Sequence, residues 1–110
     1  GRGRVLSMYS KIYTLCFQSL EAAKIGVSHL STEVGGAIAD ANIASLNILL
    51  HKEGRVTMVV RFDTLEDMNR FSQAQVSVLA GLENVFKLRE MTQNTAISVY
   101  LFDREAATVA

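Results

Sequence analysis

The 110-residue chain contains no proline and no tryptophan, and Cys16 is its single cysteine. A lone cysteine excludes an intrachain disulfide and suits a reducing compartment, so we expect a cytoplasmic protein. No stretch approaches the roughly 20 consecutive apolar residues of a membrane-spanning helix, and the N-terminal segment lacks a signal-peptide pattern. We therefore expect no association with a membrane.

Charge of one sign and the common catalytic motifs are missing as well. The 11 basic residues balance the 11 acidic ones, whereas a nucleic-acid-binding surface usually shows a basic excess, so no nucleic-acid partner is expected. The two histidines, His29 and His51, have no companions at metal-binding spacing, and a zinc site needs more ligands than these. Because no Walker A, GxSxG or dinucleotide-binding pattern occurs either, we predict no catalytic residue, no cofactor and no metal.

The composition predicts one domain in the middle of the chain. Apolar residues make up 49% of the chain and charged residues 20%, which is ordinary for a globular domain that buries its own core. The first eleven residues hold the only local excess of basic charge, with Arg2, Arg4, Lys11 and the α-amino group. We interpret residues 1–10 as a flexible lead-in or a cloning remnant. Residues 11–103 form the predicted domain, and residues 104–110 are expected to fray.

The first predicted element is a strand over residues 11–18 that is largely apolar on both sides. Ile12 and Cys16 would face one way, and Tyr13 and Leu15 the other. A strand of this kind belongs in the centre of a sheet whose two faces are both covered. The second face then needs either another layer of helices or another subunit.

A long helix is expected next, because apolar residues recur every three or four positions from Leu20 to Ala41. Ser19 would cap its start. Gly26 interrupts the pattern, and a glycine costs a helix interior about 1 kcal/mol relative to alanine. An alternative therefore places Gly26 in a loop and begins the helix near Ser28. Both versions end the helix at about Ala41.

A hairpin follows the helix. Residues 43–51 and 55–62 alternate as strands around the turn sequence KEG. Asn47 and Arg61 would lie on the face opposite the helices, where they could line a dimer cleft. The register is fixed because a slip by one residue would bury Arg61.

The remaining pattern predicts a second helix and two further strands. Asp63 or Thr64 would cap this helix, and Gly81 would end it. The segments NVFKLREM and AISVYLFD, residues 84–91 and 96–103, are then predicted as separate strands.

The order of these elements is that of the α+β sandwich called ferredoxin-like, βαββαβ, in which two helices cover one face of an antiparallel sheet. The last segment would add an extra C-terminal strand. A bare sheet face that carries apolar groups usually pairs with another chain. We therefore predict a homodimer, built sheet to sheet or edge to edge, in which the extra strand could cross to the partner.

Several stretches resemble the ACT domain, most closely the one at the C-terminus of bifunctional (p)ppGpp synthetase/hydrolases. They are STEVGGAIADANIASLNILL, GRVTMVVRFDTLEDMNR and LAGLENVFKLRE, and the resemblance covers roughly residues 11–92. It implies a small regulatory module without catalysis that dimerises and binds an amino acid between its subunits. The loop SLEAAKIGVSHL departs from the family pattern, because it lacks the proline and aspartate of the family's ligand loop.

The same order of elements is also similar to the dimeric α+β barrels, such as antibiotic-biosynthesis-type monooxygenases. That resemblance implies a cofactor-independent enzyme acting on a small hydrophobic substrate. A third alternative is a protein without a ligand whose dimerisation is its function. If an amino acid or a hydrophobic compound binds, the predicted contacts are small or polar residues near the first loop and on the second strand: Gln18, Gly26, Ser28, His29 and Asn47.

Overall fold

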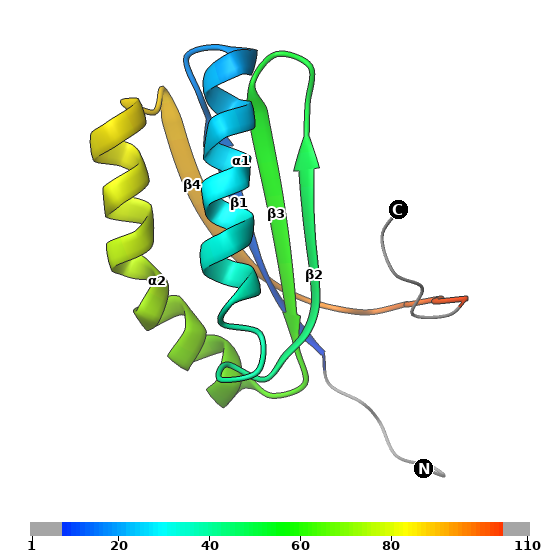
Figure 1. Ribbon diagram of the computed structural model, residues 1–110. Coiled ribbons are helices and arrows are strands. Elements are labelled where there is room, and N and C mark those ends of the chain that lie inside the picture. The colour runs from blue at the N-terminus through cyan, green and yellow to red at the C-terminus, as the bar shows by residue number, and fades with distance from the viewer. Residues whose placement is uncertain (1–7, 105–110) are drawn as a thin grey trace, which may run out of the picture.

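The computed structural model describes residues 8–104, and this part of the chain contains four strands and two helices. In chain order they are β1 (Tyr9–Cys16), α1 (Leu20–Gly35), β2 (Ile43–Leu50), β3 (Arg55–Phe62), α2 (Leu65–Phe86) and β4 (Glu90–Ile97). The strands form one antiparallel sheet in the order β2-β3-β1-β4, and both helices lie on the same face of it (Figure 1). The predicted ferredoxin-like α+β sandwich is thus confirmed.

Both helices begin where a hydroxyl side chain satisfies a free backbone N–H group. Ser19 Oγ accepts a hydrogen bond of 3.1 Å from the backbone N–H of Ala22. Thr64 Oγ1 accepts one of the same length, 3.1 Å, from the backbone N–H of Asp67. Such a cap stabilises a helix by roughly 1 kcal/mol. The N-cap predicted at Ser19 is therefore confirmed, and Thr64 is the cap of α2.

The end of the first helix differs from the prediction. α1 stops at Gly35, and residues 36–42 form turns that lead into β2 instead of continuing the helix to Ala41. The apolar spacing continues past the helix because Ala41 is buried in the same core. Asn42 then takes the left-handed conformation, with φ 54°, which asparagine tolerates better than most residues.

Gly26 lies within α1, so the alternative that placed it in a loop and began the helix near Ser28 is wrong. Its backbone is buried against the ring of Phe17, and a Cβ atom at this position would overlap the ring. The missing side chain is what allows the helix to pass so close to the exit of β1. This close packing offsets the intrinsic cost of a glycine inside a helix.

The last third of the domain also differs from the prediction. α2 continues through the expected stop at Gly81 as far as Phe86, because Leu82 is again buried in the core. In the described chain a single strand, β4, replaces the two strands predicted for residues 84–91 and 96–103. The start of the first segment is helix, and most of the second lies beyond β4.

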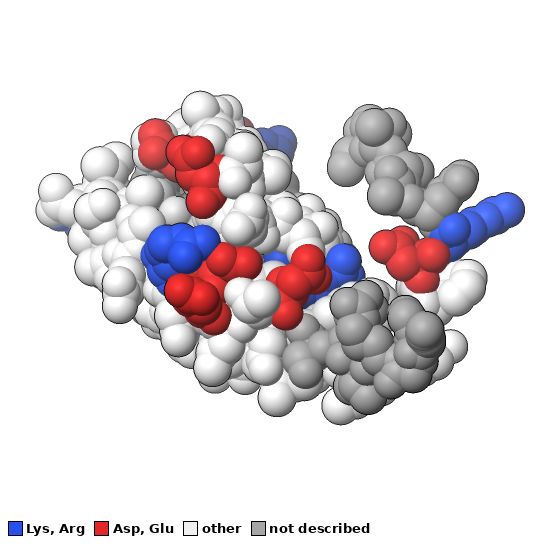
Figure 2. Space-filling view, turned by 90° about the horizontal axis from the view of Figure 1, so that it is seen from below, with Lys and Arg blue, Asp and Glu red and all other residues white. Residues whose placement is uncertain are grey.

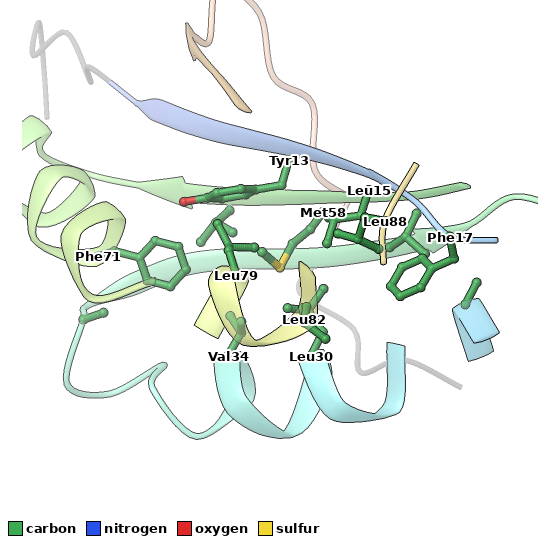
Figure 3. Close-up of a cluster of buried hydrophobic side chains, with 14 of the residues drawn as sticks. Tyr13, Leu15, Phe17, Leu30, Val34, Met58, Phe71, Leu79, Leu82 and Leu88 are labelled. Carbon is green, nitrogen blue, oxygen red and sulfur yellow. The ribbon is translucent and has the colours of Figure 1, made fainter. Parts of the chain in front are cut away.

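One layer of buried side chains fills the space between the sheet and the helices (Figure 3). All four inward-facing residues of β3 are completely buried: Val56, Met58, Val60 and Phe62. The other strands and the helices complete this core with Tyr13, Leu15, Leu30, Val34, Phe71, Leu79 and Leu82. Sliding a strand by one residue would turn its buried set outward, so this pattern fixes the register.

The sheet spans Tyr9 to Ile97, whereas the predicted domain covers residues 11–103. β1 begins at Tyr9, slightly before the expected start at residue 11. After β4, residues 98–104 run away from the sheet without forming a strand (Figure 1). We call residues 98–104 the C-terminal arm. The expectations for residues 1–7 and 105–110 lie outside the described residues.

Candidate functional site

The sheet face opposite α1 and α2 is not covered by any helix in residues 8–104 (Figure 1). We call it the outer face. Side chains alternate along a strand, so residues that neighbour buried ones point outward. On β3, Val60 and Phe62 point to the helices, and Val59 and Arg61 therefore point to the outer face. This placement agrees with the orientation predicted for Arg61.

Two rows of side chains cross the centre of the outer face. From β4 to β2 the rows are Asn94, Ile12, Val59, Asn47 and Thr92, Thr14, Thr57, Leu49. A small apolar patch thus lies among threonine and asparagine side chains that can donate and accept hydrogen bonds. On β1 this side carries Ile12, Thr14 and Cys16, as the alternation predicts, so it is apolar except for Thr14.

Arg61, on the outer face, carries a hydrogen-bond donor that lacks a partner in the described chain. It pairs with Ser10 of β1 and Ser45 of β2 in the sheet register and is half buried. Its Nε atom is buried and has no hydrogen-bond partner in the described chain. An unpaired buried donor costs about 1–3 kcal/mol, and more when it is charged.

A hollow of about 350 Å³ opens at the edge of the outer face where β1 leaves the sheet. The Cys16 thiol faces Glu90 there, with 4.0 Å between Sγ and Oε1. Arg55 and Arg89 line the same hollow, so its rim carries both signs of charge. Such a rim can hold a small polar group. Three separate segments build this site and no local motif connects them, so the sequence does not predict it.

Two of the predicted ligand contacts have structural roles. Gln18 Nε2 donates a hydrogen bond of 2.7 Å to the carbonyl oxygen of Lys87, which ties the loop after β1 to the end of α2. Gly26 is buried inside α1 against Phe17. Both residues therefore hold the first loop and the helices together at one end of the sheet.

The structure brings together only two of the five predicted contacts in one hollow. Ser28 and His29 line a wide, shallow depression of about 540 Å³ on the exposed side of α1. Asn47 lies on the outer face, on the other side of the sheet. The second histidine, His51, is hydrogen-bonded through Nε2 to Thr57 Oγ1 at 3.0 Å. The five residues thus do not converge on one pocket within a single copy of the chain.

Charged side chains are mixed on the face seen from below, where acidic and basic groups adjoin one another (Figure 2). Within residues 8–104, no group of three or more His, Cys, Asp or Glu side chains is placed to hold a metal ion. Neither of the two helices in that range is long and apolar enough to cross a membrane.

The fold has counterparts among solved structures, although no family model and no curated protein matches the sequence. Two are dimeric ferredoxin-like proteins from uncultured marine organisms. The first has a TM-score of 0.68 and 14% identity over 96% of this chain and 100% of its own. The second has a TM-score of 0.73 and 7% identity over 87% of this chain and 99% of its own.

A third counterpart is a dimeric protein of unknown function with a ferredoxin-like fold from Bacteroides fragilis NCTC 9343. Its TM-score is 0.63, with 13% identity over 81% of this chain and 94% of its own. At such low identities the likeness establishes the fold alone. The chain is therefore a ferredoxin-like α+β domain, and the comparisons do not single out the ACT domain among proteins of that fold.

Proposed function

We propose that this chain is a small homodimeric binding module without catalysis, and that its outer face and C-terminal arm together form the dimer interface. The observation that carries the proposal is the arm, where Val99, Tyr100, Leu101 and Phe102 are 96%, 85%, 46% and 75% exposed. A group of large apolar side chains that is exposed to solvent usually marks an interaction surface. The dimeric state of the solved counterparts supports a second copy as the partner.

The size of the surface supports an interface that includes the arm. Each strand has 8 residues, so the four-stranded sheet offers a face of roughly 19 by 26 Å, or about 500 Å². A stable interface buries about 800 Å² on each partner. An aromatic side chain buries about 150–250 Å². Tyr100 and Phe102 are therefore large enough to make up the difference.

The pattern of the outer face supports a symmetric arrangement. A twofold axis through its centre would set Ile12 and Val59 of one copy against the same pair in the partner. An apolar centre with a polar rim is the usual anatomy of such interfaces, and threonine and asparagine side chains surround this centre. Arg61 is half buried on this face, and the exposed part of its guanidinium could donate to acceptors of the partner.

A regulatory role is the finer part of the proposal, and the resemblance to ACT domains supports it. A small ligand such as an amino acid, held near Ser28 and His29, would favour one arrangement of the dimer over another. Gln18 lies in the loop that precedes the same helix. Asn47 would join such a site only across the interface, because it lies on the outer face.

Sedimentation equilibrium on four proteins tests the dimer. The wild type should have twice the chain mass of 12.1 kDa. Val59→Asp places a charge in the centre of the outer face, and Tyr100→Asp places one on the arm, so both should shift the protein towards the monomer. Ser77→Asp adds the same charge at an exposed position of α2 and should remain dimeric.

Tyr100→Asp is the more decisive of the two interface variants. Tyr100 is exposed in the single chain, so its replacement cannot unfold the monomer by disturbing the core. A monomeric wild type, or equal dissociation of the Ser77→Asp control, would refute the proposed interface. Dissociation by Val59→Asp but not by Tyr100→Asp would remove the arm from it.

A further inference from the structure

A cleft of about 300 Å³ lies between the turns of residues 36–42 and the first half of α2. Three alanines, Ala37, Ala41 and Ala74, and the ring of Phe71 form its apolar walls. Because alanine side chains are short, the two elements do not fill the space between them. Sites for small molecules begin at about this volume and are mostly apolar.

The wall opposite α2 is held in shape by its own backbone. The N–H of Ala41 donates to the carbonyl of Ala37 at 2.9 Å. The N–H of Ile43 donates to the carbonyl of Ile38 at 3.1 Å, which closes the turns against the start of β2. A ligand would therefore meet a wall that is already formed, and preformed walls are usual in small-molecule sites.

Gln75 supplies an unexplained polar group to this cleft. It follows Phe71 by one helical turn, is 4% exposed, and its carbonyl oxygen Oε1 has no hydrogen-bond partner in the described chain. The Tyr13 hydroxyl, which points to the Phe71 end of the core, and the Ser72 hydroxyl also lack partners (Figure 3). Native proteins rarely leave a buried acceptor unpaired. A donor from outside the chain would satisfy it.

The rim of the cleft carries one positive and one negative side chain. Arg70 and Asp40 line it. Arg70 is already engaged, because its Nη2 lies 2.6 Å from Asp67 Oδ1. Asp67 thus neutralises Arg70, and Asp40 is exposed, so solvent screens its charge and the buried walls of the cleft are uncharged. An uncharged molecule suits this site better than an anion or a cation.

We propose that the cleft binds a small uncharged molecule with an aromatic or branched apolar body and one hydrogen-bond donor, for which a phenol is the simplest form. The ring packs against Phe71 and Ala74. Gln75 Oε1 is closed to solvent in the free chain, so the side-chain amide turns on binding to bring this oxygen into the cleft, where the hydroxyl donates to it. The binding is reversible and makes no covalent bond. The cleft is separate from the outer face, so it stands whether or not the chain dimerises.

The sequence contains a signal for this site. Gln75 occupies a position of the apolar stripe of α2, four residues after Phe71 and four before Leu79, both of which are buried. A polar residue in such a stripe calls for a hydrogen-bond partner. The partner cannot be identified from the helix pattern, because the wall that faces Gln75 comes from the turns after α1.

Two matched compounds test the hydrogen bond on the full chain. para-Cresol carries the donor, and para-methylanisole has the same ring with the donor replaced by a methyl ether. Titration followed by amide shifts in nuclear magnetic resonance should show saturable changes around residues 37–41 and 70–75. We expect para-cresol to bind about tenfold more tightly than the ether, since it satisfies a buried acceptor. Equal or weaker binding of para-cresol would overturn the proposal.

Three variants locate the site. Gln75→Leu removes the acceptor and should abolish the preference for para-cresol over para-methylanisole. Ala74→Phe fills the cleft from an exposed position and should prevent binding of both compounds. Ala80→Phe adds the same ring at another exposed position of α2 and should leave binding unchanged. Retained binding in Ala74→Phe, or a retained preference in Gln75→Leu, would show that the compounds bind elsewhere.

Discussion

On β3, Val60 and Phe62 are completely buried under the helices, whereas Val59 and Arg61, which alternate with them, are half buried on the outer face. The inward residues are constrained by the packing of the core, where even a methylene group matters. The outward residues are free of that constraint within one copy of the chain. A mixture of apolar and polar groups on the outer face is therefore a better guide to function than the core.

The two faces also differ in how their contribution to stability depends on conditions. Fully burying a valine or leucine side chain stabilises a protein by about 1.5–3 kcal/mol. On the inner face this contribution belongs to each copy of the chain. On the outer face the full contribution would arise only if a second copy covered it, and it would then depend on protein concentration by mass action.

Truncating one valine on each face should give the largest effect. Val60→Ala removes buried atoms and leaves a cavity, so we expect a loss of about 2–3 kcal/mol in the free energy of unfolding at any protein concentration. If the outer face is the proposed dimer interface, Val59→Ala should cost less than about 1 kcal/mol in dilute protein and more in concentrated protein, because a second copy then covers Val59. Urea unfolding at two protein concentrations measures both. If both variants lost the same free energy of unfolding at both protein concentrations, the two faces would not differ in the way proposed.

Two glycines of α1 allow a similar comparison between a buried and an open position. Gly26 lies against Phe17, whereas Gly35 has open space beside it. Gly26→Ala forces the buried Phe17 ring to move, and overpacking of this kind typically costs about 1–3 kcal/mol. Gly35→Ala meets no atom within 4 Å and should stabilise the helix by up to about 1 kcal/mol. Thermal unfolding of the two variants should therefore shift in opposite directions. Two upward shifts would mean that helix propensity outweighs packing at Gly26, and two downward shifts would mean that alanine at Gly35 does not stabilise the helix.

Much of this fold could be predicted because local rules and packing agree. Ser19 was predicted as a cap from its residue type and position, and alternation placed Arg61 on the outer face. The prediction failed where the two disagree. Gly26 and Gly81 are poor helix residues, yet α1 and α2 continue through them because neighbouring side chains are buried. The prediction of two strands in place of β4 was wrong. Most side chains of β4 are exposed on both sides of the sheet, so apolar and polar residues do not alternate along it.

The candidate sites could be predicted far less well. Of the five expected ligand contacts, only Ser28 and His29 share a hollow, because spacing along one helix is a local property. The hollow beside Cys16 and the cleft beside Gln75 each join segments that are distant in sequence. The lining of each depends on the order of the strands and on the placement of the helices against the sheet. The residue pattern of a single sequence does not show which distant residues these arrangements bring together.

Tyr13→Phe probes a polar group on the otherwise apolar inner face. The Ser72 hydroxyl lies near the Tyr13 hydroxyl, but the two do not meet in a well-formed hydrogen bond. Removing the Tyr13 hydroxyl should therefore leave stability at neutral pH unchanged or raise it by up to about 1 kcal/mol. Burial raises the pKa of the Tyr13 phenol above its usual value of 10.0, and the Ser72 hydroxyl offsets part of this effect.

The same variant should change the alkaline behaviour. A raised pKa in the folded state means that the folded protein holds this proton more tightly than the unfolded chain does. The resulting stability is present below pH ~10 and is lost as the pH rises through the folded pKa. Tyr13→Phe should therefore reduce the loss of stability above pH ~10, measured as urea midpoints across that range. An unchanged alkaline profile would contradict this role of Tyr13.

Asp67 gives the smallest expected effect, because it lies in the first turn of α2 and not in the core. The hydrogen bond from the Thr64 side chain lowers the pKa of the Asp67 carboxyl, with smaller contributions from Arg70 and Asn42. A lowered pKa favours the ionised form in the folded state. The resulting stability is present above the unfolded value near pH ~4 and is lost as the pH falls through the folded pKa.

Asp67→Asn should flatten the decline in stability below pH ~4, measured as thermal midpoints at decreasing pH. Glu66→Gln is the matched control, since it removes one negative charge from the same turn of α2 without removing that hydrogen-bond network. If the two variants had the same acid profile, the charge at the helix start would be responsible and not the contact with Thr64. A flatter profile in Asp67→Asn alone would instead show that a polar cap at the helix start, outside both faces of the sheet, has its own measurable share in stability.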